Sequence, residues 1–261
     1  MSLDSFETVK TRFSEARAIF RPARAHALPD IVLLGFLNEI EENASVTTLI
    51  GSSEFPHRGF PNARSAFEAA QLALLLVTDP DYDRAGARAW VYYLRKDRVF
   101  AEMHPDDVQY PEKLTPSQWF RAAVNEMADL WNDLDAGKGR LILDAEALVE
   151  SQPRRPDNWA GLPIAPTLRD RLAGYAERHN LPVRTDAAEV YNRAYAALSR
   201  ESHPRTRLRP IQVRGLPNGY AEFDFEPRDV ASDADTALLL ATGALAQGYL
   251  ALVIRHHSLA V

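Results

Sequence analysis

The stretch that decides the fold is TALLLATGALAQGYLALVI, residues 236–254, which contains no charged side chain. Its small residues recur at alternating steps of four and three, which on a helix makes one continuous smooth stripe. They are Ala237, Ala241, Ala244, Gly248 and Ala251. Other helices can approach such a stripe closely, so the pattern predicts a helix at the centre of a bundle.

Two other uses of the same helix follow from its composition. It is just long enough to span a membrane. However, Thr242, Gly243, Gln247 and Gly248 lie near its middle, where each weakens insertion. A core helix with no membrane partner is therefore favoured. The smooth stripe of 236–254 could also pair subunits, which predicts a homo-oligomer as one outcome.

The whole chain has the composition of an ordinary globular protein, with 261 residues, 46% hydrophobic and 25% charged. Its net charge of −6 argues against a protein that coats nucleic acid with most of its surface. The absence of cysteine excludes disulfides, thiolate nucleophiles and cysteine-based metal sites. The opening MSLDSFETVK has no apolar run and does not resemble a secretory signal, so a cytoplasmic location is expected.

Apolar residues recur at helical spacing through most of the chain. The first predicted helix is stopped by Pro22, and Thr115 with Gln118 forms a capping box for a later one. Before the final helix, the spacing predicts helices over about 6–20, 29–50, 62–77, 81–103, 116–134, 143–150, 167–179 and 186–202.

One stretch alternates instead, IQVRGLPNGYAEFDFEP at 211–227, on both sides of a Pro-Asn-Gly turn. The predicted fold class is therefore all-α, a multi-helix bundle with one appended β-hairpin at about 211–226. We expect a single helical domain over 1–261, and the proline-rich loop 151–166 marks where it could subdivide.

A row of polar side chains lies on the predicted helix within AEVYNRAYAALSRESHPRTRLRP, residues 188–210. Tyr191, Tyr195, Ser199 and His203 follow at steps of four, and each step turns about 400° around the helix. The ends of the row are therefore about 18 Å apart, so the four cannot form one compact site. The row instead crosses from the apolar to the polar side, along a line where a ligand or another helix would lie.

Arginines surround the end of this row and create a local positive field in an acidic protein. A phosphate, a nucleotide or an acidic partner could dock there. Alternatively, they pair with the acids of the facing strand, Glu222, Asp224 and Glu226. The arginines are Arg200, Arg205, Arg207, Arg209 and Arg214.

The helix predicted over 62–77 carries Arg64, Glu68 and Gln71 on one polar row. A cation in the first turn is disfavoured by the helix dipole, and Arg before Glu is the weaker order for a pair four residues apart. We therefore expect a tertiary partner for Arg64, and a partly buried, paired Glu68. The pair either fixes helix register or meets His203, whose imidazole pKa the carboxylate would raise.

Other signals are weaker. Glu39, Glu41 and Glu42 are interpreted as a solvated face. No zinc-protease, phosphate-loop, dinucleotide or di-iron motif is present, so we expect neither a metal nor a cofactor.

Three motifs in order, RSAFE (64–68), NWAGLP (158–163) and YNRAYAALSRESH (191–203), resemble a family of uncharacterised bacterial helical proteins known as a domain of unknown function. The resemblance covers about 30–255 and implies a helical fold and a cytosolic location, but no activity. A more distant likeness is to the HEPN superfamily, many of whose bundles are metal-independent ribonucleases in toxin–antitoxin or phage-defence systems. Their usual motif places an arginine four to six residues before a histidine. Here Arg200 precedes His203 by three and Arg193 by ten, which departs from it.

Two functions remain open at this point. The first is a binding module for a small polar or anionic ligand or a partner, held by a polar seam of Arg64, Glu68, Tyr195, Ser199 and His203. Tyr191, Arg205 and Arg207 would add further ligand contacts. The second is a metal-independent endoribonuclease, in which His203 acts as general base while Arg200 and Arg64 stabilise the charge developing on the phosphate.

Overall fold

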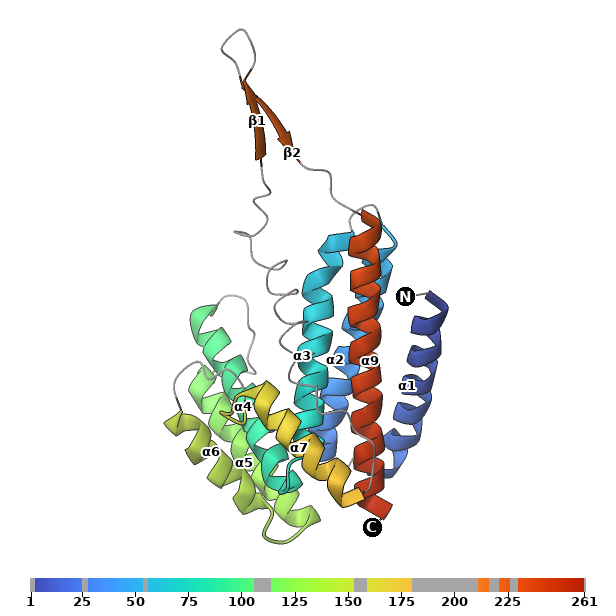
Figure 1. Ribbon diagram of the computed structural model, residues 1–261. Coiled ribbons are helices and arrows are strands. Elements are labelled where there is room, and N and C mark those ends of the chain that lie inside the picture. The colour runs from blue at the N-terminus through green and yellow to red at the C-terminus, as the bar shows by residue number, and fades with distance from the viewer. Residues whose placement is uncertain are drawn as a thin grey trace.

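The predicted all-α bundle is confirmed (Figure 1). The computed structural model describes residues 3–24, 28–53, 56–105, 114–152, 159–179, 211–215, 221–225 and 230–260. The helices are α1 (Leu3–Arg24), α2 (Leu28–Gly51), the 3-10 turn η1 (Pro56–Gly59), α3 (Phe60–Val77), α4 (Tyr82–Met103), α5 (Pro116–Leu134), α6 (Gly139–Ser151), α7 (Ile164–His179) and α9 (Val230–Ala260).

Helix α9 runs through one half of the bundle, in contact with α1, α2 and α3 (Figure 1). All five residues of its smooth stripe are buried. A Cβ on Gly248 would lie 2.7 Å from Cε2 of Phe13 and 3.1 Å from Cδ1 of Ile40, so only glycine allows this approach. The stripe therefore packs inside the chain. By length and composition the segment Asp233–His256 could also cross a membrane, and half of its most apolar window is buried in the bundle.

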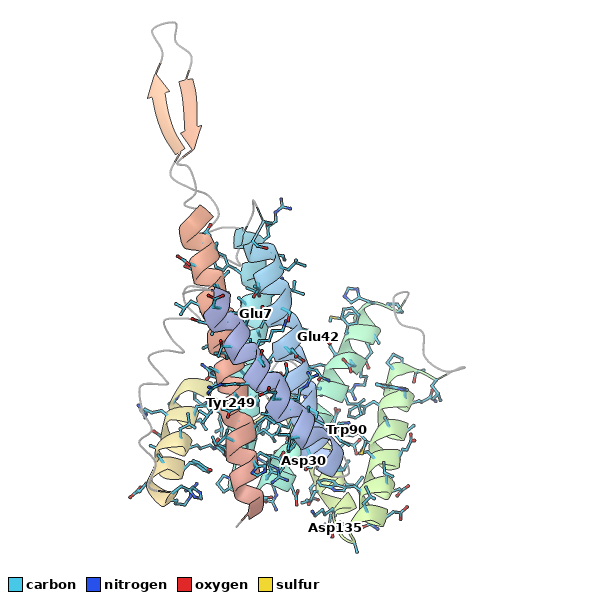
Figure 2. All side chains as sticks on the ribbon, turned by 90° about the vertical axis from the view of Figure 1, so that its right-hand side faces the viewer. Glu7, Asp30, Glu42, Trp90, Asp135 and Tyr249 are labelled. Atoms are coloured by element: carbon cyan, nitrogen blue, oxygen red, sulfur yellow. The ribbon has the colours of Figure 1, made fainter. Side chains whose placement is uncertain are left out.

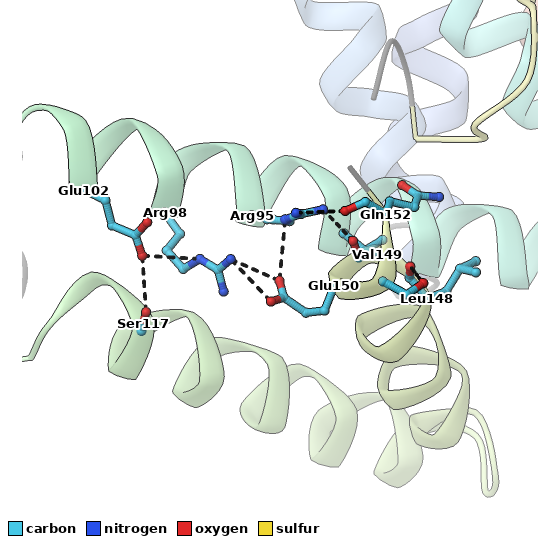
Figure 3. A network of polar contacts seen from close by, with 9 residues as sticks. Arg95, Arg98, Glu102, Ser117, Leu148, Val149, Glu150 and Gln152 are labelled. Carbon is cyan, nitrogen blue, oxygen red and sulfur yellow. Dashed lines mark hydrogen bonds and ion pairs between the residues drawn. The ribbon is translucent and has the colours of Figure 1, made fainter. Parts of the chain in front are cut away.

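Helices α4, α5 and α6 form the other half and join α2 through α4 (Figure 1). Arg95 is buried in α4 and donates to the carbonyls of Val149 and Gln152, so it caps the end of α6 (Figure 3). Arg98 pairs with Glu150 at 3.1 Å in the same network. Apolar residues from both sides of the loop 151–166, including Val149 before it and Leu168 after it, share one core.

The observed helix boundaries match the predicted ones where a local capping motif sets the end of the helix, and some of the others differ. Thr115 and Gln118 form the predicted capping box of α5. The predicted stop at Pro22 is wrong, because α1 continues to Arg24; a proline in the last turn disrupts little of the helix. Helix α6 begins at Gly139, four residues before the predicted 143. A side chain at this position would collide with the Ala128 carbonyl of α5, so the start of α6 lies against α5 only because residue 139 is a glycine. The helix predicted over 186–202 lies outside the described residues.

Two short strands pair antiparallel in the segment where the sequence predicts a hairpin. Strand β1 (Ile211–Gly215) faces β2 (Ala221–Phe225), with the register running from Ile211 opposite Phe225 to Gly215 opposite Ala221. Residues 216–220 between them are outside the described part of the chain.

A buried ion pair ties the first turn of α2 to the far end of α9. Asp30 is 1% exposed and accepts from Arg255, Nε to Oδ1 at 2.8 Å and Nη2 to Oδ2 at 3.3 Å. The hydroxyl of Tyr82, at the start of α4, donates to Oδ1 at 2.9 Å, and the Arg255 guanidinium lies 4.0 Å from the Tyr82 ring centroid. Burial, followed by the charge of Asp30, raises the pKa of Tyr82 and keeps this donor protonated. Figure 2 shows Asp30 beside the lower part of α9.

We predict that Arg255→Met lowers the free energy of unfolding by about 3–5 kcal/mol, because it leaves the Asp30 carboxylate buried without its cation. The double variant Asp30→Asn with Arg255→Met should lose less free energy of unfolding than Arg255→Met alone, because it leaves no buried charge unpaired. Urea denaturation at pH 7 measures both. The control is Arg140→Met, whose arginine is 84% exposed in its pair with Asp144. An equal loss in Arg255→Met and Arg140→Met would contradict the role of the buried pair.

Two glycines of α9 provide a matched test of its central packing. Gly248→Ala should cost about 1–3 kcal/mol, because its methyl group must displace the buried ring of Phe13. Gly243→Ala should instead gain up to about 1 kcal/mol, since nothing lies within 4 Å of its added Cβ and alanine is the better helix former. Thermal unfolding of both variants checks the opposite signs. If both variants changed the melting temperature in the same direction and to the same extent, α9 would not pack against Phe13 at Gly248.

Candidate functional site

Helix α3 is buried along most of its length, and a narrow row that includes Arg64 and Glu68 keeps partial exposure. The Arg64 Nε lies 2.8 Å from Oε1 of Glu68, with the two side chains 26% and 39% exposed. Glu68 is thus partly buried and paired, as the sequence predicts. For Arg64 the sequence argument predicts a tertiary partner, and the ion pair that the structure shows is with its own helix.

The next polar residue of the row has a structural role. Gln71 is 4% exposed, and its Nε2 donates to Oε1 of Gln247 on α9. Both amides would be costly to bury alone, so each satisfies the other across the α3–α9 contact. Among the described residues of this row, Arg64 and Glu68 keep partial exposure, whereas Gln71 is buried.

Glu39 of α2 lies within electrostatic reach of this pair. The Glu39 side chain is exposed, but the protein around it removes part of its hydration, which raises its pKa first, and the nearby Glu68 carboxylate raises it further. Glu42, on the exposed side of α2 (Figure 2), adds to this shift, while Lys96 of α4 opposes it. The Glu68 carboxylate therefore disfavours the charged form of Glu39, and a bound cation would relieve this repulsion.

The interpretation of Glu39, Glu41 and Glu42 as a solvated face is wrong for one of them. Glu41 accepts from Oγ of Ser14 at 2.7 Å and pairs with Arg17, both on α1. Helix α1 packs back across this side of α2, which local spacing within α2 does not reveal.

Aromatic side chains of α4 lie near Glu39 and Glu68. The Tyr92 and Tyr93 rings stand at 86° with centroids 5.3 Å apart, and the Lys96 Nζ lies 5.5 and 5.6 Å from them. Burial, followed by the charge of Glu39, raises the pKa of Tyr93, so its hydroxyl stays protonated. We call the set Glu39, Arg64, Glu68, Tyr92, Tyr93 and Lys96 the three-helix cluster.

The cluster contains two of the residues that the sequence singles out, Arg64 and Glu68. Sequence reasoning assigned Glu39 only to a solvated face and missed the three residues of α4, although Tyr92 and Tyr93 precede Lys96 by four and three residues, a spacing that predicts their contact on one helix. The remaining candidates lie outside the described residues: Tyr191, Tyr195, Ser199, Arg200, His203, Arg205 and Arg207. Within the described ranges there is no group of three or more His, Asp or Glu side chains placed to hold a metal ion.

Comparison of the chain with protein families, with curated proteins and with solved structures gave no match. The likeness to the domain of unknown function and to HEPN bundles therefore stays a prediction from the motifs alone.

We predict that Glu39→Gln raises the melting temperature at pH 7. Folding raises the pKa of Glu39, so the folded protein holds this proton more tightly than the unfolded chain does. The resulting gain in stability is complete below the ordinary carboxyl pKa of about 4 and is lost as pH rises through the raised pKa. The glutamine should thus stabilise at pH 7 and make no difference below about pH 4. Differential scanning calorimetry at both pH values measures this.

The control is Glu126→Gln, an exposed glutamate on α5, which should leave the melting temperature unchanged at both pH values. A lower melting temperature for Glu39→Gln at pH 7 would mean that Lys96 outweighs the repulsion from Glu68, contrary to this account.

Proposed function

We propose that this protein binds a small polar ligand at the polar seam, and that the three-helix cluster forms the part of the binding site on α2, α3 and α4. The observation that carries the proposal is the partly exposed Arg64–Glu68 pair on a mostly buried helix, with Glu39 close enough for Glu68 to raise its pKa. Crowded carboxylates reduce stability, so a bound ligand offers a reason for their arrangement.

The chemistry of the cluster suits a polar ligand. The planar guanidinium of Arg64 can donate two parallel hydrogen bonds to a carboxylate or phosphate. Glu68 accepts hydrogen bonds beside it, and the protonated Tyr93 can donate one. In this proposal Tyr195, Ser199 and His203 complete the seam, and Tyr191, Arg205 and Arg207 add contacts to anionic groups.

A thermal-shift screen tests the proposal. Wild-type protein is heated with nucleotides, short RNAs, anionic metabolites and small amines. A ligand at a hundred times its Kd stabilises by about 2.7 kcal/mol, which raises the melting temperature of a chain this size by roughly 5–10 °C. The double variant Arg64→Ala with His203→Ala should lose this shift.

The matched control is Arg140→Ala, which removes an arginine from an exposed pair of the same spacing on α6 and should keep the full shift. If no compound stabilises the wild type more than the double variant, the seam has no ligand-binding role. RNA in the panel also reports the alternative function. Cleavage that a chelator does not inhibit and that His203→Ala abolishes would assign a metal-independent ribonuclease in place of a binding protein.

A further inference from the structure

Two tyrosine rings of α4 form a corner that already holds a cation. Tyr92 and Tyr93 are nearly perpendicular, at 86°, and the Lys96 Nζ lies 5.5 Å from one centroid and 5.6 Å from the other. Ring faces carry negative potential, and a distance below about 6 Å is within the range of a cation–π contact. Phe36 of α2 supports the corner through an edge contact with Tyr93 at 5.7 Å.

Carboxylates give this corner an excess of negative charge. Glu68 and Glu42 both act on Glu39, and Glu39 and Glu68 both act on Tyr93. The Arg64 Nε pairs with Glu68 at 2.8 Å. Lys96 is then the cation that favours ionised Glu39. Burial raises the pKa of the neighbouring Asp97, and the charge of Lys96 opposes this rise with a smaller effect. An added positive charge would therefore be attracted from several sides.

Lys96 itself is on the exposed side of α4. Its unbranched stem has four rotatable bonds and can move its ammonium into water at little cost other than the lost cation–π contacts. The lysine thus marks a position that another ammonium group can take.

We propose that the corner formed by Tyr92, Tyr93 and Glu39 binds a primary ammonium group of the ligand, in exchange with the ammonium of Lys96. This inference rests on the proposed function and makes its ligand class definite, an alkyl amine with further polar groups directed toward Arg64 and Glu68. Binding strengthens as pH rises through the pKa of Glu39, because the ionised carboxylate attracts the ammonium.

The test replaces the internal cation by an external one. Lys96→Ala removes the ammonium and the three carbons beyond Cβ, and n-butylamine at pH 7 supplies an ammonium on an alkyl chain one carbon longer. We expect n-butylamine to bind Lys96→Ala at least about fivefold more tightly than wild type, where Lys96 competes for the corner. NMR titration of the full-length protein measures both Kd values. n-Butanol, the neutral analogue, should bind neither protein more tightly than the other.

A second substitution tests the carboxylate. Adding Glu39→Gln to Lys96→Ala should remove the fivefold gain, whereas adding the exposed Glu126→Gln should keep it. Circular dichroism confirms that each variant is folded. Equal binding of n-butanol and n-butylamine, or a gain that survives Glu39→Gln, would overturn the inference.

The two proposals fail in different ways. A ligand from the thermal-shift screen that needs Arg64, combined with no binding of n-butylamine to Lys96→Ala, would leave the binding function standing and disprove the ammonium corner. Binding of n-butylamine that depends on Glu39, combined with no Arg64-dependent ligand, would leave the corner standing and disprove the role of Arg64.

Discussion

The buried ion pair between Asp30 and Arg255 is the constraint on which the arrangement of the bundle depends. It joins residues 225 positions apart and includes the Tyr82 hydroxyl, so the beginnings of α2 and α4 and the end of α9 meet at one point. A carboxylate that is 1% exposed must keep its cation, because leaving a buried charge unpaired costs about 3–5 kcal/mol. The pair thereby determines how far α9 extends along α2.

That register decides what every other residue of α9 contacts. Gly248 then meets Phe13 and Ile40, and Gln247 meets Gln71 of α3. A shift of one residue would rotate α9 by about 100° and bring larger side chains into the places that its small residues occupy. The hydrogen bond between the Gln71 and Gln247 amides favours the same register, since the two side chains meet only in this position.

The burial of α3 between α2 and α9 bears on the proposed ligand site. It leaves only a narrow row of the helix accessible, and the charges of Arg64 and Glu68 lie on that row. Glu39 from α2 and the tyrosines of α4 border the same place, so charges and aromatic faces from three helices converge at the edge of the core. Such an arrangement suits ligand recognition, because its polar groups are oriented by rigid helices while solvent access remains.

Local periodicity by itself determined most helix spans, the α5 capping box and the small-residue stripe of α9. Each depends on residues within a few turns of one another. It also identified Arg64 and Glu68, a pair on one helix. Only the tertiary structure decided that Asp30 meets Arg255, that α1 crosses Glu41, and that Glu39 stands near Glu68 and Lys96. These contacts join separate helices, and the spacing along one helix carries no information about which neighbour it packs against or in what register.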